Sequence, residues 1–271
     1  MLANARMYSV TPECKAAWRT VLDWVLADSG MQARYEDHDP PKLLSDLWAR
    51  DDLACVQMCG LPFSLRTPHA TILAAPVPSL PRYGGKPIYW SDIAVRADST
   101  FTTFEDTLGA RAGYTLKDSQ SGYFAFRYHL LRKFPSRLQP YSEITGKLLN
   151  PRGVIKALAE GRIDVGPLDS YVHDLLRRHE PETAAKLRVI ESTAMTPIPL
   201  VVASPGVADD AAARLRNALL SCHAAPELAA TLDTLLLARF TAVDVADYDV
   251  LLDRARAADL SLSARVGVPP P

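Results

Sequence analysis

The residues best suited to hold a small ligand are two serines around a glutamine, followed by a glycine: Ser119-Gln120-Ser121-Gly122. Serine is a favoured N-cap residue, and glycine allows another chain segment to approach the backbone closely. The residues after Gly122 have helical spacing, so hydroxyl groups would lie beside the unpaired N–H groups of a helix start. That combination binds small oxyanions such as phosphate, phosphonate, sulfonate or carboxylate. A plain helix cap uses the same residue types, so the motif alone leaves both interpretations open.

The composition limits the classes of protein to which the chain can belong. The chain has 271 residues, a formal net charge of −1 and 48% hydrophobic residues, which suits one large domain or two lobes. A near-neutral charge without a basic block argues against nucleic acid as the main partner. No apolar run reaches the roughly 18 residues of a membrane span, so direct membrane insertion is not expected.

The cysteines and histidines predict neither a metal site nor a catalytic centre. The four cysteines have neither metal-ligand nor disulfide spacing. Cys59 adjoins Gly60, but the pattern places no histidine to activate this thiol as a nucleophile. The six histidines show no ligand spacing, and His129 and His173 are expected on solvated helix faces. We therefore predict no catalytic residue, no metal and no cofactor.

Extended and helical patterns alternate along the chain, which predicts an α/β fold with mostly parallel sheets. The pattern restarts after Asp98 and ends in helices without a further strand, which indicates two lobes. Strands are expected at 6–10, 33–36, 53–58, 88–95, 111–116, 163–168, 187–190 and 198–203, and the last helices at 209–222, 226–237 and 246–258.

In open α/β sheets, ligands bind beyond the carboxyl ends of the strands. The residues at those ends are Tyr8, Gly60, Ser119 to Gly122, and Asp169. Asp169 also begins a predicted helix, where aspartate is a common N-cap. Ligand contact and helix capping are both retained as roles for this residue.

Five segments, in this order and at this spacing, resemble those of a known family. The chain is similar to the phosphate/phosphite/phosphonate-type substrate-binding proteins of ABC importers, a branch of the type II periplasmic binding proteins. The segments are Arg6-Met7-Tyr8, residues 57–62 (QMCGLP), residues 89–99 (YWSDIAVRADS), residues 118–123 (DSQSGY) and residues 154–169, which include AEGRIDVGPLD.

The resemblance implies two lobes, each a mixed, mostly parallel sheet flanked by helices, with two crossover strands as a hinge. Lobe 1 would be residues 1–95 plus 200–271, and lobe 2 residues 96–199. The ligand would be trapped between the lobes by hinge closure. In the family the serine turn holds the oxyanion, which implies that role for Ser119, Gln120 and Ser121. Aromatic residues line the cleft, which implies Tyr8 and Tyr89. The acid at the strand end faces a cationic or hydroxyl group of the ligand, which implies Asp169.

One segment departs from the family pattern. Many phosphonate binders have Ser-His after a Thr-Gly pair, whereas here Lys147-Leu148-Leu149 follow Thr145-Gly146. The histidine that helps to hold a phosphonate is therefore absent, and sulfonate, carboxylate or a substituted pyrimidine stay open as ligands beside phosphonate.

These observations predict a non-catalytic protein that binds a small anionic solute as the substrate-binding component of an ABC importer. An ABC permease is its candidate partner, and a monomer is expected. Two alternatives are a cytoplasmic ligand sensor and an enzyme of the pyrimidine-precursor type on the same fold, although the cysteine-rich motif of that enzyme is missing. The resemblance implies a periplasmic location, whereas residues 1–6 (MLANAR) do not read as a signal peptide, which leaves a cytoplasmic location open.

Overall fold

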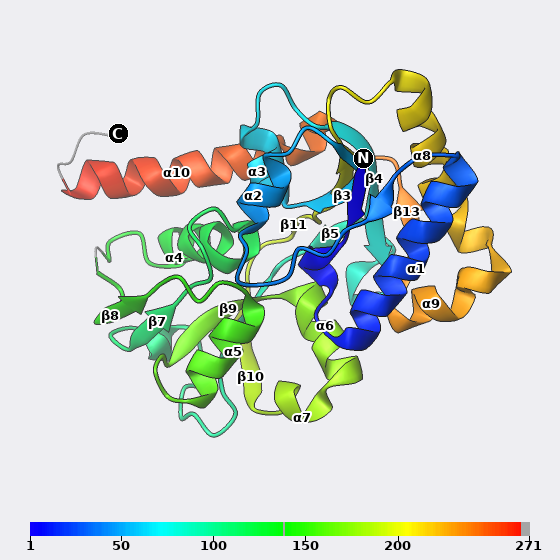
Figure 1. The fold of residues 1–271 in the computed structure, drawn as a ribbon. Helices are drawn as coiled ribbons and strands as arrows, with labels where there is room; N and C mark the ends of the chain where they lie inside the picture. Colours follow the sequence, from blue (N-terminus) through cyan, green and yellow to red (C-terminus); the bar gives the residue numbers. More distant parts are fainter. Residues whose placement is uncertain (138, 267–271) are drawn as a thin grey trace. The chain divides into compact units, whose positions relative to one another are not determined.

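The computed structural model describes residues 1–137 and 139–266 (Figure 1). The chain forms two compact units. Unit 1 comprises Met1–Ile88 and Pro197–Tyr248, and unit 2 comprises Tyr89–Thr196 and the segment from Asp249 onward. The boundaries expected from the sequence, after residues 95 and 199, differ from this division. The segment from Asp249 onward, which is expected in lobe 1 from its sequence, belongs to unit 2.

Unit 1 is built on a six-stranded mixed sheet in the order β13-β4-β12-β3-β1-β2. β1 pairs in parallel with β2 and β3, whereas β12 runs antiparallel to β3 and β4, and β13 runs antiparallel to β4. The strands are β1 (Leu2–Asn4), β2 (Arg34–Tyr35), β3 (Leu53–Met58), β4 (Thr71–Pro78), β12 (Leu200–Ala203) and β13 (Leu237–Thr241). The helices are α1 (Pro12–Ser29), α2 (Leu44–Trp48), α3 (Gly60–Leu65), α8 (Asp209–Ser221) and α9 (Ala229–Thr234).

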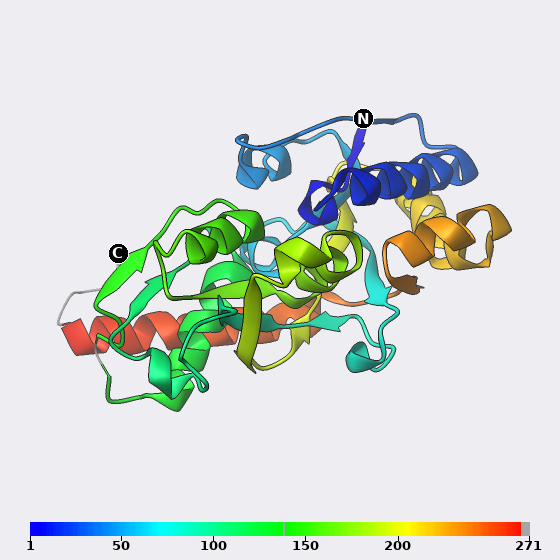
Figure 2. The same cartoon turned by 90° about the horizontal axis from the view of Figure 1, so that it is seen from below.

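Helix α1 shows how local sequence builds unit 1. The Thr11 hydroxyl accepts a hydrogen bond from the Cys14 N–H at 3.2 Å, and Gly30 ends the helix in the left-handed conformation. Trp18 and Val21, which are fully buried, belong to the apolar stripe that the spacing predicts. That stripe faces the core of unit 1. The helix lies beside α8 and α9, as Figure 2 shows.

Unit 2 is built on a five-stranded mixed sheet in the order β10-β6-β9-β7-β8. β7 runs parallel to β8 and β9, and β6 runs antiparallel to β9 and β10. The strands are β6 (Ser91–Arg96), β7 (Arg111–Gly113), β8 (Glu143–Thr145), β9 (Val165–Asp169) and β10 (Leu187–Ser192). The helices are α4 (Ala125–Lys133), α5 (Pro151–Ala159), α6 (Ser170–His179), α7 (Pro181–Ala184) and α10 (Asp249–Val266). The linking strands β5 (Ile88–Tyr89) and β11 (Thr196–Pro197) pair separately.

Packing explains the two differences in unit boundaries. β6 is a central strand of the unit 2 sheet, so the chain enters this unit before Ser91. α10 packs against α4 (Figure 1), where the Arg254 guanidinium lies 5.6 Å from the centre of the Tyr128 ring. Arg254 also donates a hydrogen bond to the Met195 carbonyl at 3.0 Å. These contacts place α10 in unit 2.

Several strands differ from their predictions. The first strand is Leu2–Asn4, and Arg6–Tyr8 forms a 3-10 turn instead of the expected strand. β4 and β13 were not expected, and antiparallel pairs are as prominent as parallel ones, so the sheets are mixed but not mostly parallel. β4 contains Pro76 and Pro78. Proline argues against the prediction of a strand, because it donates no hydrogen bond to a neighbouring strand.

Candidate functional site

The serine turn begins with a widened helical turn. Gln120–Phe124 forms a π-helical turn that leads into α4, and such turns occur frequently at functional sites. The Ser119 hydroxyl caps this turn by accepting the Gly122 N–H at 3.0 Å. Gly122 is required by close packing, because a Cβ at this position would overlap the Thr115 hydroxyl. The capping role expected from the sequence is therefore present.

The turn also exposes unused donors. The backbone N–H groups of Gln120 and Ser121 donate no hydrogen bond to any residue that the structure describes. The Gln120 side chain is 1% exposed, and its Oε1 has no hydrogen-bond partner among the described residues. The turn thus combines backbone donors at a helix start with the hydroxyls of Ser119 and Ser121.

Asp169 lies beside this turn, at the end of β9. The Ser121 hydroxyl donates to Asp169 Oδ2 at 3.3 Å, and the Ser91 hydroxyl donates to the Ser121 carbonyl at 2.6 Å. Asp169 Oδ1 accepts the N–H groups of Tyr171 and Val172, both at 3.0 Å, so the aspartate caps α6. One carboxylate oxygen therefore serves the helix, and the other faces the serine turn.

Burial sets the protonation of Asp169. The side chain is 5% exposed, and its desolvation raises its pKa from 3.8 to about 7. The two backbone N–H groups and the Ser121 hydroxyl oppose this shift, and the nearby charge of Asp92 adds to it. A cationic or hydrogen-bond-donating group placed beside Asp169 would favour the ionised form.

A buried acid–base pair lies behind Asp169 in unit 2. His173 Nδ1 is 3.1 Å from Asp92 Oδ2, and the two residues are 2% and 1% exposed. Trp90 Nε1 and the Ser192 hydroxyl each donate to Asp92 Oδ1 at 2.9 Å. The expectation that His173 lies on a solvated face is wrong, because its helix α6 turns this side chain toward β6. A charged residue inside the apolar run of β6 was the signal that could have predicted a buried partner.

The remaining predicted contacts are divided between the units. Tyr89 belongs to unit 2 and is 1% exposed. Tyr8 lies in unit 1 on the 3-10 turn and not on a strand, and it is also 1% exposed. Gly60 is the first residue of α3 in unit 1, directly after Cys59. The structure therefore brings Ser119–Gly122 and Asp169 together within one unit.

The possible metal ligands and the thiol groups of the described residues are dispersed or buried. No three His, Cys, Asp or Glu side chains converge there on a metal position. The four cysteines are buried and form no disulfide, and burial raises the pKa of Cys55 and of Cys222 to about 12. Within 1–137 and 139–266, no helix is long and apolar enough to cross a membrane.

Comparison with known proteins gives one family and many similar folds. Residues 13–248 match the family model for the periplasmic substrate-binding protein of phosphonate ABC transporters. No curated protein sequence matches the chain. A binding protein component of an ABC phosphonate transporter from Pseudomonas aeruginosa has 19% identity and a TM-score of 0.75, covering 97% of this chain and 96% of its own.

Two further solved structures have the same fold. PhnD1 from Prochlorococcus marinus, in complex with methylphosphonate, has 15% identity and a TM-score of 0.78, covering 96% of this chain and 98% of its own. A protein from Xanthomonas citri bound to ATP has 19% identity and a TM-score of 0.66, covering 96% and 97%. At these identities the likeness establishes the fold, and the predicted two-lobed α/β architecture is confirmed.

Proposed function

Because this chain belongs to the family of periplasmic substrate-binding proteins of phosphonate ABC transporters, we propose that its serine turn binds a phosphonate-class oxyanion. The family resemblance read from the sequence is confirmed, and the family consists of substrate-binding components, not enzymes. The enzyme alternative is therefore not supported. The protein's partner in this function is an ABC permease, to which it delivers the bound solute.

The observation that carries the proposal is the arrangement of donors at Ser119–Gly122. The N–H groups of Gln120 and Ser121 are unused among the described residues and lie at a helix start, where the dipole favours an anion. The Ser119 oxygen accepts the Gly122 N–H, which leaves its O–H group to donate. The Ser121 O–H, now weakly bonded to Asp169 at 3.3 Å, can turn to a ligand oxygen.

Asp169 would select among oxyanions. A carboxylate within reach of the anion repels a second full charge, and it gains from an ammonium, hydroxyl or ring N–H on the ligand. We therefore expect an aminophosphonate or hydroxyphosphonate to bind more tightly than inorganic phosphate. The missing histidine after Gly146 points the same way, since one phosphonate-holding group is absent.

The test is calorimetry with methylphosphonate, aminomethylphosphonate, methanesulfonate, acetate and inorganic phosphate. A hydrogen bond to a charged group contributes roughly 1.5–3 kcal/mol, so Ser121→Ala should weaken binding of the tightest ligand about tenfold or more. Ser142→Ala, on an exposed serine outside the turn, is the matched control. Equal affinity of Ser121→Ala and the wild type would show that the turn is a helix cap only.

Asp169→Asn separates the two roles of the aspartate. Asparagine keeps an oxygen for the α6 cap but cannot carry the charge. We expect the variant to bind aminomethylphosphonate more weakly than the wild type does, and inorganic phosphate more tightly. If Asp169→Asn bound both probes as tightly as the wild type does, Asp169 would not contact the ligand. Ligand contact by Tyr8, Gly60 and Tyr89 stays a prediction, and so does the monomeric state of the protein.

A further inference from the structure

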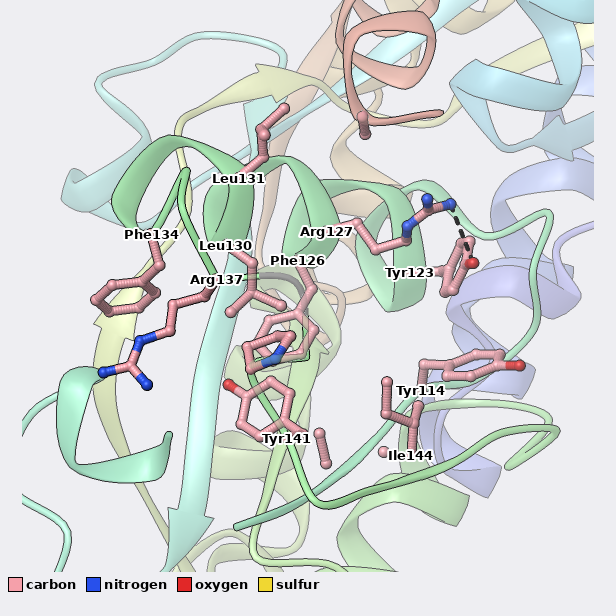
Figure 3. A pocket seen from close by; sticks show the side chains of 14 residues that line it. Tyr114, Tyr123, Phe126, Arg127, Leu130, Leu131, Phe134, Arg137, Tyr141 and Ile144 are labelled. Atoms are coloured by element: carbon pink, nitrogen blue, oxygen red, sulfur yellow. Dashed lines mark hydrogen bonds between the residues drawn. The ribbon is translucent and has the colours of Figure 1, made fainter. Parts of the chain in front are cut away.

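Helix α4 lines two different cavities within unit 2. One side of the helix, with Phe126 and Leu130, and Phe134 just after its end line a cavity of about 390 Å³ whose walls are largely apolar (Figure 3). Another side, with Ala125, Tyr128, His129 and Arg132, lines a second cavity of about 300 Å³. These four residues follow the i, i+3, i+4, i+7 spacing of a single helix face.

The far wall of this second cavity comes from α10 and from the chain after β10. Arg254 reaches it from α10, fixed by the Met195 carbonyl at 3.0 Å and by the Tyr128 ring. Thr193 lies on the segment that follows β10, and its Oγ1 accepts the Ser91 N–H at 3.0 Å. The Thr193 O–H group is therefore left to donate.

The positive charge in this cavity is not neutralised. Neither Arg132 nor Arg254 forms an ion pair with any residue that the structure describes. The carboxylate next to the cavity, Glu191, is already bound by His129 at 2.6 Å and by Lys133 at 2.9 Å. His129 is largely buried, and desolvation lowers its pKa, which favours the neutral ring. Two guanidinium groups thus face one hollow without a counter-ion.

We propose that the cavity formed by α4, α10 and Thr193 is a second anion site that binds a phosphate group. Guanidinium forks match phosphate oxygens and form paired, charge-assisted hydrogen bonds. Arg254 is already held in place, Arg132 is exposed and can close on the ligand, and Thr193 supplies a neutral donor. The volume exceeds that of free phosphate, so the organic part of a small phosphate monoester also fits.

This site shares no lining residue with the serine turn. Ser91 joins the two places, because its N–H donates to Thr193 Oγ1 and its hydroxyl donates to the Ser121 carbonyl. The proposal does not depend on the proposed function, since the serine turn can fail to bind a phosphonate while the second cavity still binds phosphate.

The experiment titrates the full chain with inorganic phosphate and with glycerol phosphate by calorimetry at constant ionic strength. The Ser119→Ala/Ser121→Ala double variant is the background, so that the hydroxyl groups of the serine turn do not contribute; the arginine variants then separate the cavity from the backbone donors that the turn keeps. One equivalent should bind, and Arg132→Gln and Arg254→Gln should each weaken binding at least tenfold. Arg256→Gln, at an exposed arginine of α10 that does not line the cavity, should leave binding unchanged.

The outcomes separate support from refutation. Tighter binding of glycerol phosphate would identify an ester as the ligand, and equal binding would identify the phosphate group itself. Absence of binding in the serine double variant would overturn the proposal, as would binding that survives both arginine substitutions. Arg132 is exposed, so its substitution is expected to leave the fold intact even where Arg254→Gln disturbs the packing of α10.

Discussion

Replacing Asp169 by asparagine should stabilise the protein at neutral and higher pH but have little effect near pH 4. The folded protein holds this carboxyl at a pKa of about 7, whereas the unfolded chain releases the proton near 3.8. Between these two pKa values the folded state binds one more proton than the unfolded state. The free energy of unfolding of the wild type therefore falls as the pH rises from the lower pKa to the higher one. Asparagine has no charge to bury and does not titrate.

The size of the effect follows from the pKa difference. At 1.36 kcal/mol per pKa unit, a rise from 3.8 to about 7 corresponds to about 4 kcal/mol, which is an upper limit. Asparagine retains the oxygen that accepts the Tyr171 and Val172 N–H groups, so the cap of α6 is kept. The repulsion between the charges of Asp169 and Asp92 is one cause of the raised pKa, so its relief in the variant is already contained in this limit.

The assay is urea unfolding of both proteins at pH 4, 5, 6, 7 and 8 without ligand. The variant's advantage should grow steadily with pH and level off above pH 7. Asp51→Asn, at an exposed aspartate, controls for the loss of one negative charge and should show no such growth. A pH-independent difference between Asp169→Asn and the wild type would refute the argument that burial raises this pKa.

Two further predictions concern stability. Gly122→Ala should destabilise the protein by about 1–3 kcal/mol, because its Cβ overlaps the Thr115 hydroxyl. In thermal unfolding, the double variant with Thr115→Ala should be more stable than Gly122→Ala but less stable than the wild type, because the Thr115 Cβ and the Ser119 Oγ still lie 2.9 Å from the added Cβ; no recovery would place the strain elsewhere. Tyr248→Phe should cost about 1 kcal/mol, since the fully buried hydroxyl donates to a backbone carbonyl at 2.9 Å. An unchanged denaturation midpoint for Tyr248→Phe would show that this hydrogen bond contributes no net stability.

Features encoded within one turn of chain were predictable from the sequence. The N-cap Thr11 and the ending Gly30 of α1 lie where the sequence places them. The serine turn was found for the same reason, because the capping hydroxyl and the N–H group that donates to it are three residues apart. Its π-helical form was not predicted, since the extra residue is accommodated by packing of Gly122 on Thr115, seven positions earlier.

Features that depend on distant partners were missed. β4 and β13 are joined by antiparallel pairing across more than 150 residues, and neither strand has the alternation that would have identified it alone. The burial of His173 depends on Asp92, 81 residues earlier. Charge on a helix is usually solvated, so only knowledge of which face meets β6 could reverse that expectation.

The same distinction explains how much of the candidate site was accessible. Each half of the contact between Ser121 and Asp169 was predicted from a strand end, and the family resemblance placed both near a ligand. What the sequence could not supply is the state of the carboxylate, because its pKa depends on full burial and on the charge of Asp92. An aspartate of ordinary pKa beside the turn would repel every oxyanion at neutral pH. One that titrates near 7 accepts a proton or a cationic ligand group at little cost, so discrimination between phosphate and aminophosphonate should depend on this burial more than on the serines.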